Sequence, residues 1–416
     1  MTDSDVIVLG AGMVGVSTAL HLQKRGRSVV LIDRRGAGEE TSYGNTGIIQ
    51  REGVVPYPFP RDPALIARYA FNRLPESHLD WRALPAIAPW LYRYWRASTP
   101  AAIAATARGA RPLIERCVTE HETLLGEAGA LGLMRRTGYL RVYRSTAALD
   151  GAMRKDQAAS ETWGVNFELV SRERLGVLEP HLKGGLVGAM FMPDPVSVSD
   201  PEAVTKAYAR LFQERGGRFV RGEAGTLAPA PRGWQLETAG GSVAAPAVVI
   251  ALGPWSDIIF RRLGYRIPFG VKRGYHMHFR ALGNATLTRP IVDAEAGYAL
   301  TPMLRGIRLT TGAEFARRDA PPTPVQLARV EPLARDLFPL GERLDAEPWL
   351  GRRPCLPDML PAVGQATRHG GLWFNFGHHH LGFTLGPVTG RLLAEMMTGE
   401  TPFTATAPYA PERFDS

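Results

Sequence analysis

The sequence predicts an α/β protein with a parallel sheet, joined to a second part that is built on a mostly antiparallel sheet. The first observation is an apolar run at Val6–Leu9, followed by a glycine-rich turn, a helical pattern and a second apolar run at residues 29–32. The second is another buried-strand pattern at residues 247–252. Such unbroken apolar runs are typical of parallel strands, because both faces of a parallel sheet are covered. The third is the alternation of residues 270–280 and 298–314, which is typical of strands in a second sheet.

The composition is that of a globular chain with more than one unit. The chain has 416 residues, enough for two or three packed units, and its 45% hydrophobic and 21% charged content are typical of soluble proteins. No stretch approaches the ~18 unbroken apolar residues of a membrane-spanning helix. A strand pattern begins by Val6 with no basic region or cleavable apolar segment before it. We therefore expect no signal peptide and a cytoplasmic location.

The net charge of +9 comes mainly from arginine scattered along the chain. Nucleic-acid binding would favour a clustered basic stripe with interleaved aromatic residues. No such stripe stands out, so we expect no nucleic-acid partner. The charge indicates mainly a solvated surface, and contact with an anionic membrane, at the inner face of the cell membrane, is the second interpretation. Cys117 and Cys355 are too far apart in the sequence for a metal-ligand spacing, and we expect no metal.

The glycine-rich turn is the strongest functional signal. Gly10 permits a tight turn, Gly12 lets the backbone approach a pyrophosphate, and Gly15 lets the helix lie close to the strand. The helix then directs unpaired N–H groups and its positive end toward phosphates. Asp33 ends the second strand, where it can accept hydrogen bonds from ribose hydroxyls. We predict a Rossmann-type dinucleotide-binding unit. The alternative is an ordinary βαβ unit whose glycines only serve packing.

The next part of the chain is a polar loop and a long helical stretch. Residues 41–47 are rich in small polar groups, which can wrap a flat polar ring or form a solvated turn. From residue 64 to about residue 127 the pattern is helical and broken by prolines. Within it, residues 90–96 are aromatic and basic. They favour a helix packed on the core with its arginines reaching solvent, over a segment that lies on a membrane.

Helices and strands alternate through the middle of the chain. Residues 138–143 alternate like a strand, and residues 147–163 and 171–178 are typical of short surface helices. Asp200 and Pro201 predict a helix that runs to Glu214, because an acid suits the cap and proline suits the first turn. Further strands are predicted at residues 218–220 and 234–237, before the buried strand at residues 247–252.

The second sheet places two histidines on one face. Along residues 270–280, His276 and His278 share a face with Gly274 and Arg280, while Tyr275 points the other way. Because no third ligand has a suitable spacing, we expect a structural or hydrogen-bonding role for the two histidines rather than a metal site. A proline-bounded helix is predicted over residues 321–339.

The C-terminal part returns to a strand, a glycine loop and a helix. A strand at residues 372–376 leads to a loop with His378, His379 and His380, and a helix is expected from about Gly386 to Met397. Three consecutive side chains cannot easily converge on one ion, so we expect no metal here either. The helix start offers instead a second positive end for an anion.

Together these segments resemble the FAD-dependent D-amino-acid oxidase superfamily, and within it the bacterial D-amino-acid dehydrogenase small-subunit type. The matching segments occur in the family's order at residues 10–15, 41–47, 249–256, 351–358 and 376–384. The resemblance implies a Rossmann-type FAD-binding domain with a parallel sheet, interleaved with an α+β substrate domain on a mostly antiparallel sheet. We expect residues 1–77, 187–260 and 345–416 in the FAD-binding domain, and residues 78–186 and 261–344 in the substrate domain.

The resemblance also implies FAD as the cofactor. Asp33 and Arg34 would hold its adenosine end, and Gly382 would lie near the isoalloxazine ring. Some relatives tether the flavin to a cysteine, but Cys355 does not match that position, so we expect FAD to be bound non-covalently. The expected FAD contacts are Gly10, Gly12, Met13, Val14, Gly15, Asp33, Arg34, Thr41, Ser42, Asn45, Thr46, Gly47, Ala224, Gly253, Trp255, Arg353, Gly377, His378, His379, Leu381, Gly382 and Thr384.

Four residues make up the expected catalytic set. An amino acid is best held by its carboxylate, for which arginine offers a planar pair of donors. The resemblance implies this role for Arg353, and a structural arginine near the flavin is the alternative. Tyr275 is the expected phenol partner and Arg308 a weaker one. His379 is expected to contact substrate or flavin.

The implied reaction is oxidative deamination of a D-amino acid to a 2-oxo acid and ammonia, by hydride transfer to flavin N5. Electrons would pass to a quinone or another respiratory-chain acceptor rather than to oxygen. A relative that oxidises a secondary amine, such as hydroxyproline or sarcosine, or that oxidises glycine, would share every cofactor motif and stays an alternative. A non-catalytic flavoprotein subunit is the distant alternative. The sequence leaves the oligomeric state open.

Overall fold

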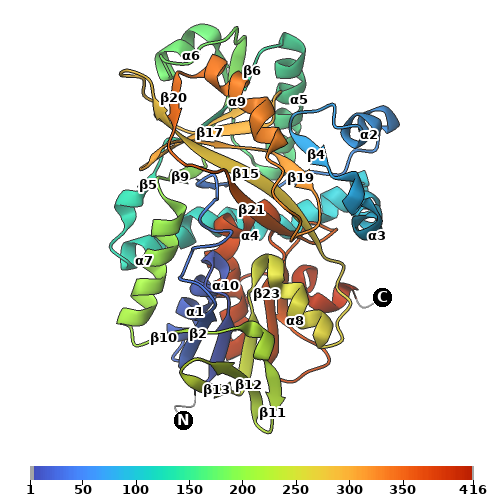
Figure 1. The fold of residues 1–416 in the computed structure, drawn as a ribbon, viewed down its shortest axis with the longest axis vertical. Helices are drawn as coiled ribbons and strands as arrows, with labels where there is room; N and C mark the ends of the chain where they lie inside the picture. Colours follow the sequence, from blue (N-terminus) through green and yellow to red (C-terminus); the bar gives the residue numbers. More distant parts are fainter. Residues whose placement is uncertain (1–3, 415–416) are drawn as a thin grey trace.

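The computed structural model describes residues 4–414, which form two large sheets, one above the other in Figure 1. The lower sheet has six strands, all parallel except for the last pair. Its order is β10 (Arg218–Arg221), β2 (Val29–Asp33), β1 (Val6–Leu9), β14 (Ala247–Ile250), β23 (Leu372–Phe376) and β22 (Ala362–Gln365). The predicted parallel sheet is therefore confirmed.

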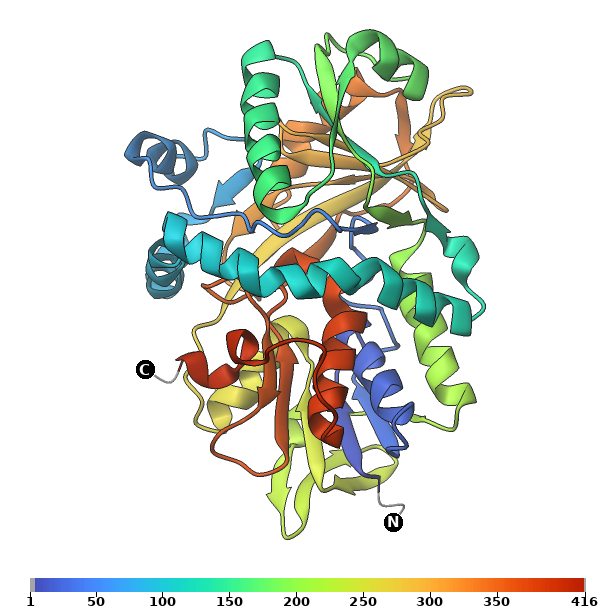
Figure 2. The ribbon, with the colours of Figure 1, turned by 180° about the vertical axis from the view of Figure 1, so that it is seen from behind.

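Both faces of this sheet are covered, which explains the unbroken apolar runs. Val6 and Val8 pack into one core cluster, while Ile7 and Leu9 pack into another on the opposite face. Helices α1 (Met13–Gln23) and α10 (Gly382–Thr398) lie side by side against the sheet (Figure 2). The other face carries α8 (Ser256–Arg262) and a small antiparallel sheet of β11 (Ala228–Ala230), β12 (Gly233–Thr238) and β13 (Gly241–Ala245).

The upper sheet is mostly antiparallel, as predicted. Its path is β4 (Ser77–Leu79), β19 (Ala313–Phe315), β15 (Gly270–Ala281), β18 (Gly306–Thr310), β17 (Tyr298–Met303), β16 (Ile291–Asp293), β6 (Tyr139–Tyr143), β8 (Gly188–Met192) and β7 (Glu168–Ser171). Strands β20 (Leu340–Arg343) and β21 (Trp349–Cys355) also pair with β15. Helices α5 (Thr146–Trp163), α6 (Arg172–Leu178) and α9 (Val325–Leu337) belong to this part of the molecule (Figure 1).

The remaining elements connect the two sheets. They are α2 (Pro63–Ala70), α3 (Leu84–Arg96), α4 (Pro100–Glu127), α7 (Pro201–Glu214) and a small sheet of β3 (Ile48–Ile49), β9 (Val196–Val198) and β5 (Met134–Arg135). The predicted helix at Pro201–Glu214 is confirmed, with the Asp200 carboxylate accepting from the Ala203 N–H at 3.0 Å.

Three details differ from the sequence-based expectations. The stretch of residues 64–127 is not only helical, because it includes β4, which pairs with the distant strand β19. Helix α10 begins at Gly382, not near Gly386 as expected. Gly386 and Pro387 resemble a helix boundary in the sequence, but they lie inside the first turns of the helix. Strands β8 and β21, which we assigned to the FAD-binding domain, pair with the upper sheet. The division into domains as a whole stays a prediction.

The aromatic segment at residues 90–96 is a helix with two faces. Trp90 and Tyr94 are buried, and the Trp90 indole N–H donates to the Cys355 carbonyl at 3.1 Å. Tyr92, Arg93 and Arg96 are exposed on the other face of α3. The predicted core packing is therefore confirmed for one face. Within residues 4–414, no helix is long and apolar enough to cross a bilayer.

Candidate active site

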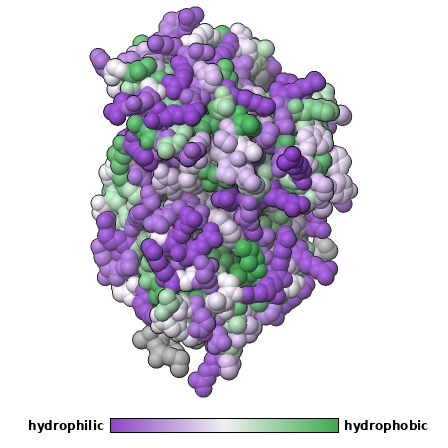
Figure 3. Space-filling model, viewed as in Figure 1, coloured by the Kyte–Doolittle hydropathy of each residue, from purple (hydrophilic) through white to green (hydrophobic). Residues whose placement is uncertain are grey.

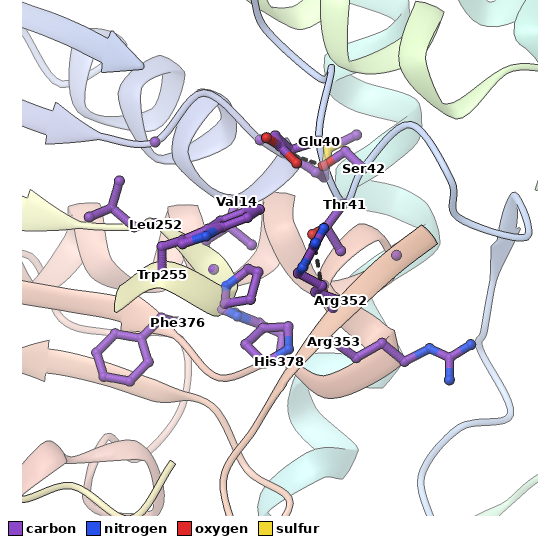
Figure 4. Close-up of a pocket in the computed structure, with 18 of the residues that line it drawn as sticks. Val14, Glu40, Thr41, Ser42, Leu252, Trp255, Arg352, Arg353, Phe376 and His378 are labelled. Atoms are coloured by element: carbon purple, nitrogen blue, oxygen red, sulfur yellow. Dashed lines mark hydrogen bonds between the residues drawn. The ribbon is translucent and has the colours of Figure 1, made fainter. Parts of the chain in front are cut away.

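A deep cavity lies where the carboxyl ends of β1, β2 and β14 meet β21 of the upper sheet. Ligands of open α/β sheets bind at this edge. The empty space is about 1580 Å³, counting the part that opens to solvent. Figure 4 shows side chains from several distant segments around it. Figure 3 shows a group of hydrophobic residues in the lower half of one face, between hydrophilic ones. The segments that line it are residues 10–14, 32–34, 40–50, 222–224, 251–259, 349–354 and 375–383, each in part, together with Gly274, Tyr275 and Thr310 of the upper sheet.

The glycine turn forms the floor of the cavity. Gly10 has φ +105°, and a Cβ there would meet the Ala251 carbonyl oxygen at 2.4 Å. A Cβ on Gly15 would meet the Gly10 carbonyl oxygen at 1.7 Å. No side chain caps α1 at Gly12, and the Ser42 hydroxyl accepts from the Met13 N–H at 2.9 Å. The turn thus presents backbone rather than side chains to the cavity, which suits a phosphate group.

Asp33 stands at the tip of β2, as the sequence predicts. Its carboxylate accepts from the Ala11 N–H at 2.7 Å and from the Arg35 N–H at 2.9 Å. Burial raises the pKa of Asp33, and the two backbone N–H groups oppose that shift. The neighbouring Arg34 pairs with Glu40 at 2.9 Å and lies over the Trp255 ring, 4.5 Å from its centroid. Asp33, Arg34, Glu40 and Trp255 all line the cavity.

A second helix end approaches from α10. This helix crosses α1 closely, because a Cβ on Gly390 would meet the Ser17 backbone at 2.8 Å. Its N-terminus at Leu381 has no side-chain cap. The His121 imidazole of α4 bonds to the Phe383 carbonyl through Nε2 at 2.8 Å and to the Tyr208 hydroxyl through Nδ1 at 3.0 Å. Two uncapped helix ends therefore lie near one cavity, as a dinucleotide requires.

The three consecutive histidines point in different directions, although all three line the cavity. His378 Nε2 is 3.0 Å from the Thr389 hydroxyl, and the His380 ring packs near the Tyr57 ring. His379 has φ +56°, and its buried Nε2 has no hydrogen-bond partner among the described residues. Burial lowers the pKa of all three, to about 3 for His378 and His380. They are therefore neutral near neutral pH. Among residues 4–414, no group of three metal-ligating side chains is arranged to hold an ion.

Arg353 lines the cavity from β21. Its guanidinium donates to the carbonyls of Gly312 at 2.8 Å and Thr311 at 3.3 Å, and Figure 4 shows it extending away from Thr41 and His378. Two carbonyls use only part of the five N–H donors of a guanidinium. Burial lowers its pKa, yet an arginine stays charged near neutral pH. The side chain can therefore still receive a carboxylate.

Tyr275 does not have the environment that we expected. Its hydroxyl is buried in a cluster, 3.0 Å from Arg273 and 2.9 Å from Glu314, and it accepts from the Thr323 N–H at 2.8 Å. Burial raises its pKa. Tyr275 lines the cavity, but its hydroxyl already has three partners in this cluster. Its role as a phenol partner of the substrate stays a prediction.

Arg308 lies behind the cavity wall rather than in it. Its Nε donates to His278 Nε2 at 3.0 Å, and His278 Nδ1 donates to the Asp345 carboxylate at 2.8 Å. The other end of the guanidinium donates to the carbonyls of Tyr43, at 3.1 Å, and Asn45. This series of hydrogen bonds holds the loop at residues 41–47, and several residues of the loop line the cavity. The expected hydrogen-bonding role of His278 is confirmed.

Most of the expected FAD contacts line the cavity, but some do not. Gly15, Gly47, Gly377, Leu381 and Thr384 lie beside or beneath the lining residues. Sequence reasoning missed lining residues on β21 and around it, above all Glu40, Trp349 and Arg352. Arg352 Nε donates to the Arg318 carbonyl at 3.0 Å, and Thr41 donates to the Arg352 carbonyl (Figure 4). No local pattern marks Trp349 and Arg352, because the pairing of β21 with β15 brings them to the cavity. Glu40 lies in the loop after β2, where it pairs with Arg34.

The parallel sheet, the glycine turn and the cavity at the strand ends are those of a dinucleotide-binding protein. A family model described as FAD dependent oxidoreductase, DAO, matches residues 5–396, and the chain belongs to this family. It is 32% identical to a D-amino acid dehydrogenase of Methylobacterium sp. (strain 4-46), over 98% of this chain and 99% of that one. It is 28% identical to a D-amino-acid oxidase of Bradyrhizobium diazoefficiens, over 98% of each.

Solved structures show the same fold. Glycine oxidase from Geobacillus kaustophilus superposes with a TM-score of 0.75 at 22% identity, over 99% of each chain. L-proline dehydrogenase from P. horikoshii superposes with a TM-score of 0.72 at 20% identity, over 99% of this chain and 98% of that one. The protein is an FAD-dependent oxidoreductase, as the resemblance implied.

The residues of the cavity fit FAD. A tight glycine turn that exposes backbone at Gly10 and Gly12, an acid at the strand tip and two uncapped helix ends suit an adenine dinucleotide. The unpartnered His379 Nε2 suits a polar ring or substrate. Cys355 does not line the cavity, and burial raises its thiol pKa, so it is a poor nucleophile. Non-covalent binding stays a prediction.

Proposed function

We propose that the protein oxidises a D-amino acid to the 2-oxo acid and ammonia and passes the electrons to a quinone or another respiratory-chain acceptor. The observation that carries the proposal is the Arg353 guanidinium in the wall of the flavin cavity. Bound FAD supplies the hydride acceptor in such a reaction. The names of the relatives support an amino-acid substrate, since they include D-amino acid dehydrogenases and a D-amino-acid oxidase.

Arg353 binds the substrate carboxylate in this proposal. The carbonyls of Gly312 and Thr311 fix the guanidinium plane, and its remaining donors receive the two carboxylate oxygens. A fixed carboxylate fixes the Cα–H bond in turn, and a geometry held in advance lowers the barrier. The water-poor surroundings strengthen the charge pairing.

His379 is the second substrate contact. A neutral imidazole with a free Nε2 can accept a hydrogen bond from the substrate amine. Burial keeps its pKa well below the usual range, so it does not compete as a cation with the amino group. Its strained backbone, with φ +56°, aims the ring into the cavity.

The experiment is reduction of the bound flavin by a panel of amines without oxygen. D-alanine, D-arginine, cis-4-hydroxy-D-proline, sarcosine and glycine are mixed with the holoenzyme, and loss of the flavin absorbance is followed. The proposal expects bleaching by at least one D-amino acid and faster reoxidation by a soluble quinone than by air. Bleaching by sarcosine or cis-4-hydroxy-D-proline but by neither D-alanine nor D-arginine would favour the secondary-amine alternative. A flavin that no amine reduces would favour a non-catalytic subunit.

A further inference from the structure

We propose that a surface formed by α2 and α3 docks on an anionic membrane. The α2–α3 surface consists of the exposed aromatic residues Phe71, Trp81 and Tyr92 and of six exposed arginines, namely Arg61, Arg68, Arg73, Arg82, Arg93 and Arg96. Both helices lie at one edge of the molecule, as Figures 1 and 2 agree. The proposal is independent of which amine the enzyme oxidises.

The aromatic side chains of this surface are unusually exposed for their type. Phe71 is 64% exposed, Trp81 50% and Tyr92 58%. The rings of Phe71 and Trp81 contact each other, with centroids 6.2 Å apart, and Arg73 lies 5.8 Å from the Phe71 centroid. Clustered exposed aromatic rings are rare on soluble proteins unless they contact something else, and Trp and Tyr are enriched at membrane interfaces.

The helices themselves are built like interfacial helices. Helix α2 has no fully buried residue, and its apolar residues Leu65 and Ile66 are only half-buried. Helix α3 buries Trp90 and Tyr94 and turns Tyr92, Arg93 and Arg96 outward. A helix with aromatic and arginine residues on its outer face is typical of segments that lie in the headgroup region of a bilayer.

The charges of the surface favour anionic lipid over a neutral surface. Residues 61–96 hold six arginines and three acids. The acids are engaged locally: Asp62 and Asp80 cap helices, and Glu76 accepts from the Tyr69 hydroxyl. Across residues 4–414, no carboxylate forms an ion pair with any of the six arginines. Arg61 donates to the Trp95 carbonyl at 3.0 Å and lies over its ring, and the other five arginines remain available to a lipid phosphate.

The inner side of α3 faces a second cavity. Ala86, Ile87 and Trp90 line it together with Asp257 of α8, and its empty space is about 1280 Å³, counting the part that opens to solvent. Pro254 and Trp255, immediately before Asp257, line the flavin cavity. Docking through α3 would thus bring a membrane within reach of the flavin side of the molecule, which suits the proposed membrane-borne acceptor.

The test is co-sedimentation of the holoenzyme with vesicles. Vesicles of phosphatidylcholine mixed with phosphatidylglycerol are compared with vesicles of phosphatidylcholine alone, at low and high salt. We expect binding to the anionic vesicles that weakens with salt. The Phe71→Asp/Trp81→Asp variant should bind at least about tenfold more weakly, because two aromatic anchors are lost and two anions gained. Flavin content and flavin reduction should not change.

The matched control is Leu169→Asp/Val177→Asp, which replaces two side chains that are 53% and 80% exposed on β7 and α6, outside the α2–α3 surface. It should bind vesicles like the unaltered protein. If the aspartate variant loses flavin, Arg73→Gln/Arg93→Gln, which changes only exposed charges, must still weaken anionic binding by about tenfold. The proposal is overturned if the unaltered protein does not bind anionic vesicles or if neither variant weakens binding. The protein could instead form a dimer in light scattering and not bind vesicles. If Phe71→Asp/Trp81→Asp made that dimer dissociate, the surface would be assigned to a second copy of this chain.

Discussion

Two adjacent arginines on β21 have different surroundings, and this difference predicts different roles. Arg353 extends away from the nucleotide side, whereas Arg352 lies beside Thr41 with its Cζ 5.9 Å from the Trp255 centroid (Figure 4). We predict that Arg353→Met raises the KM for the amino acid about 100-fold, because a two-pronged bond to the carboxylate is lost. FAD should stay bound. Steady-state kinetics with a dye acceptor measure the effect.

Arg352→Met is the control for that variant. It removes the same charge one residue away, where the Nε donates to the Arg318 carbonyl. The KM should stay within a small factor of the original value. Equal increases for both variants, or none for Arg353→Met, would contradict the assignment of the clamp to Arg353.

The raised pKa of Asp33 predicts how FAD binding depends on pH. Burial raises the pKa of its carboxyl above the usual value near 3.8. Only the ionised form can accept from both the ribose and the Ala11 and Arg35 N–H groups. FAD affinity should therefore rise with pH through this raised pKa and level off above it. Titration of the apoprotein with FAD at several acidic pH values measures this.

Asp33→Asn tests the same carboxylate. The amide loses one acceptor and places an NH₂ against a backbone N–H, so FAD should bind about tenfold more weakly at neutral pH. Its affinity should also change less with pH in the acidic range. A variant with the original pH dependence would show that another group is responsible.

The loop at residues 41–47 depends on elements that lie behind it. Arg308 on β18 holds the carbonyls of Tyr43 and Asn45, and His278 and Asp345 orient its guanidinium. Arg308→Met leaves these carbonyls without their donor, so we predict that FAD dissociates at least about tenfold more readily. Fluorescence of released flavin on dilution measures the rate. Arg280→Met, which only breaks an exposed pair with Glu342, is the control and should change nothing.

The crossing of α1 and α10 depends on small residues. A Cβ at Gly390 would lie 2.8 Å from backbone atoms of Ser17 and Thr18, and backbone cannot move aside cheaply. We predict that Gly390→Ala lowers the free energy of unfolding by about 1–3 kcal/mol, as overpacked cores do. Thermal unfolding of the holoenzyme measures it. Gly176→Ala, where a Cβ meets nothing within 4 Å, should be neutral or stabilising.

At the scale of the whole molecule, the two sheets have separate cores and share the flavin cavity. One cluster joins β1, α1, α4 and α10, and another lies within the upper sheet around Met277, Leu300 and Leu309. The chain crosses between the sheets several times, so each contains segments from distant parts of the sequence. Strand β21 pairs with the upper sheet, whereas β22, the next strand in the chain, belongs to the lower one. A simple cut of the sequence therefore cannot describe both units.

Local patterns could be predicted well because their causes are local. The turn at residues 10–15, the acid at Asp33 and the helix cap at Asp200 depend on backbone geometry within a few residues, and the structure has each as predicted. The cofactor followed from the same short-range signals together with the resemblance. The start of α10 was wrong by four residues, because glycine inside a helix resembles a helix boundary in sequence.

What the sequence by itself determined was the set of backbone cradles for a dinucleotide, since glycine, acid and helix start act through neighbouring residues. Only the tertiary structure decided which polar side chains reach the cavity. The Tyr275 hydroxyl donates to Glu314 and the Arg308 Nε donates to His278. These contacts arise from pairings between strands far apart in the chain. Strand register selects such partners, and a single sequence does not state register.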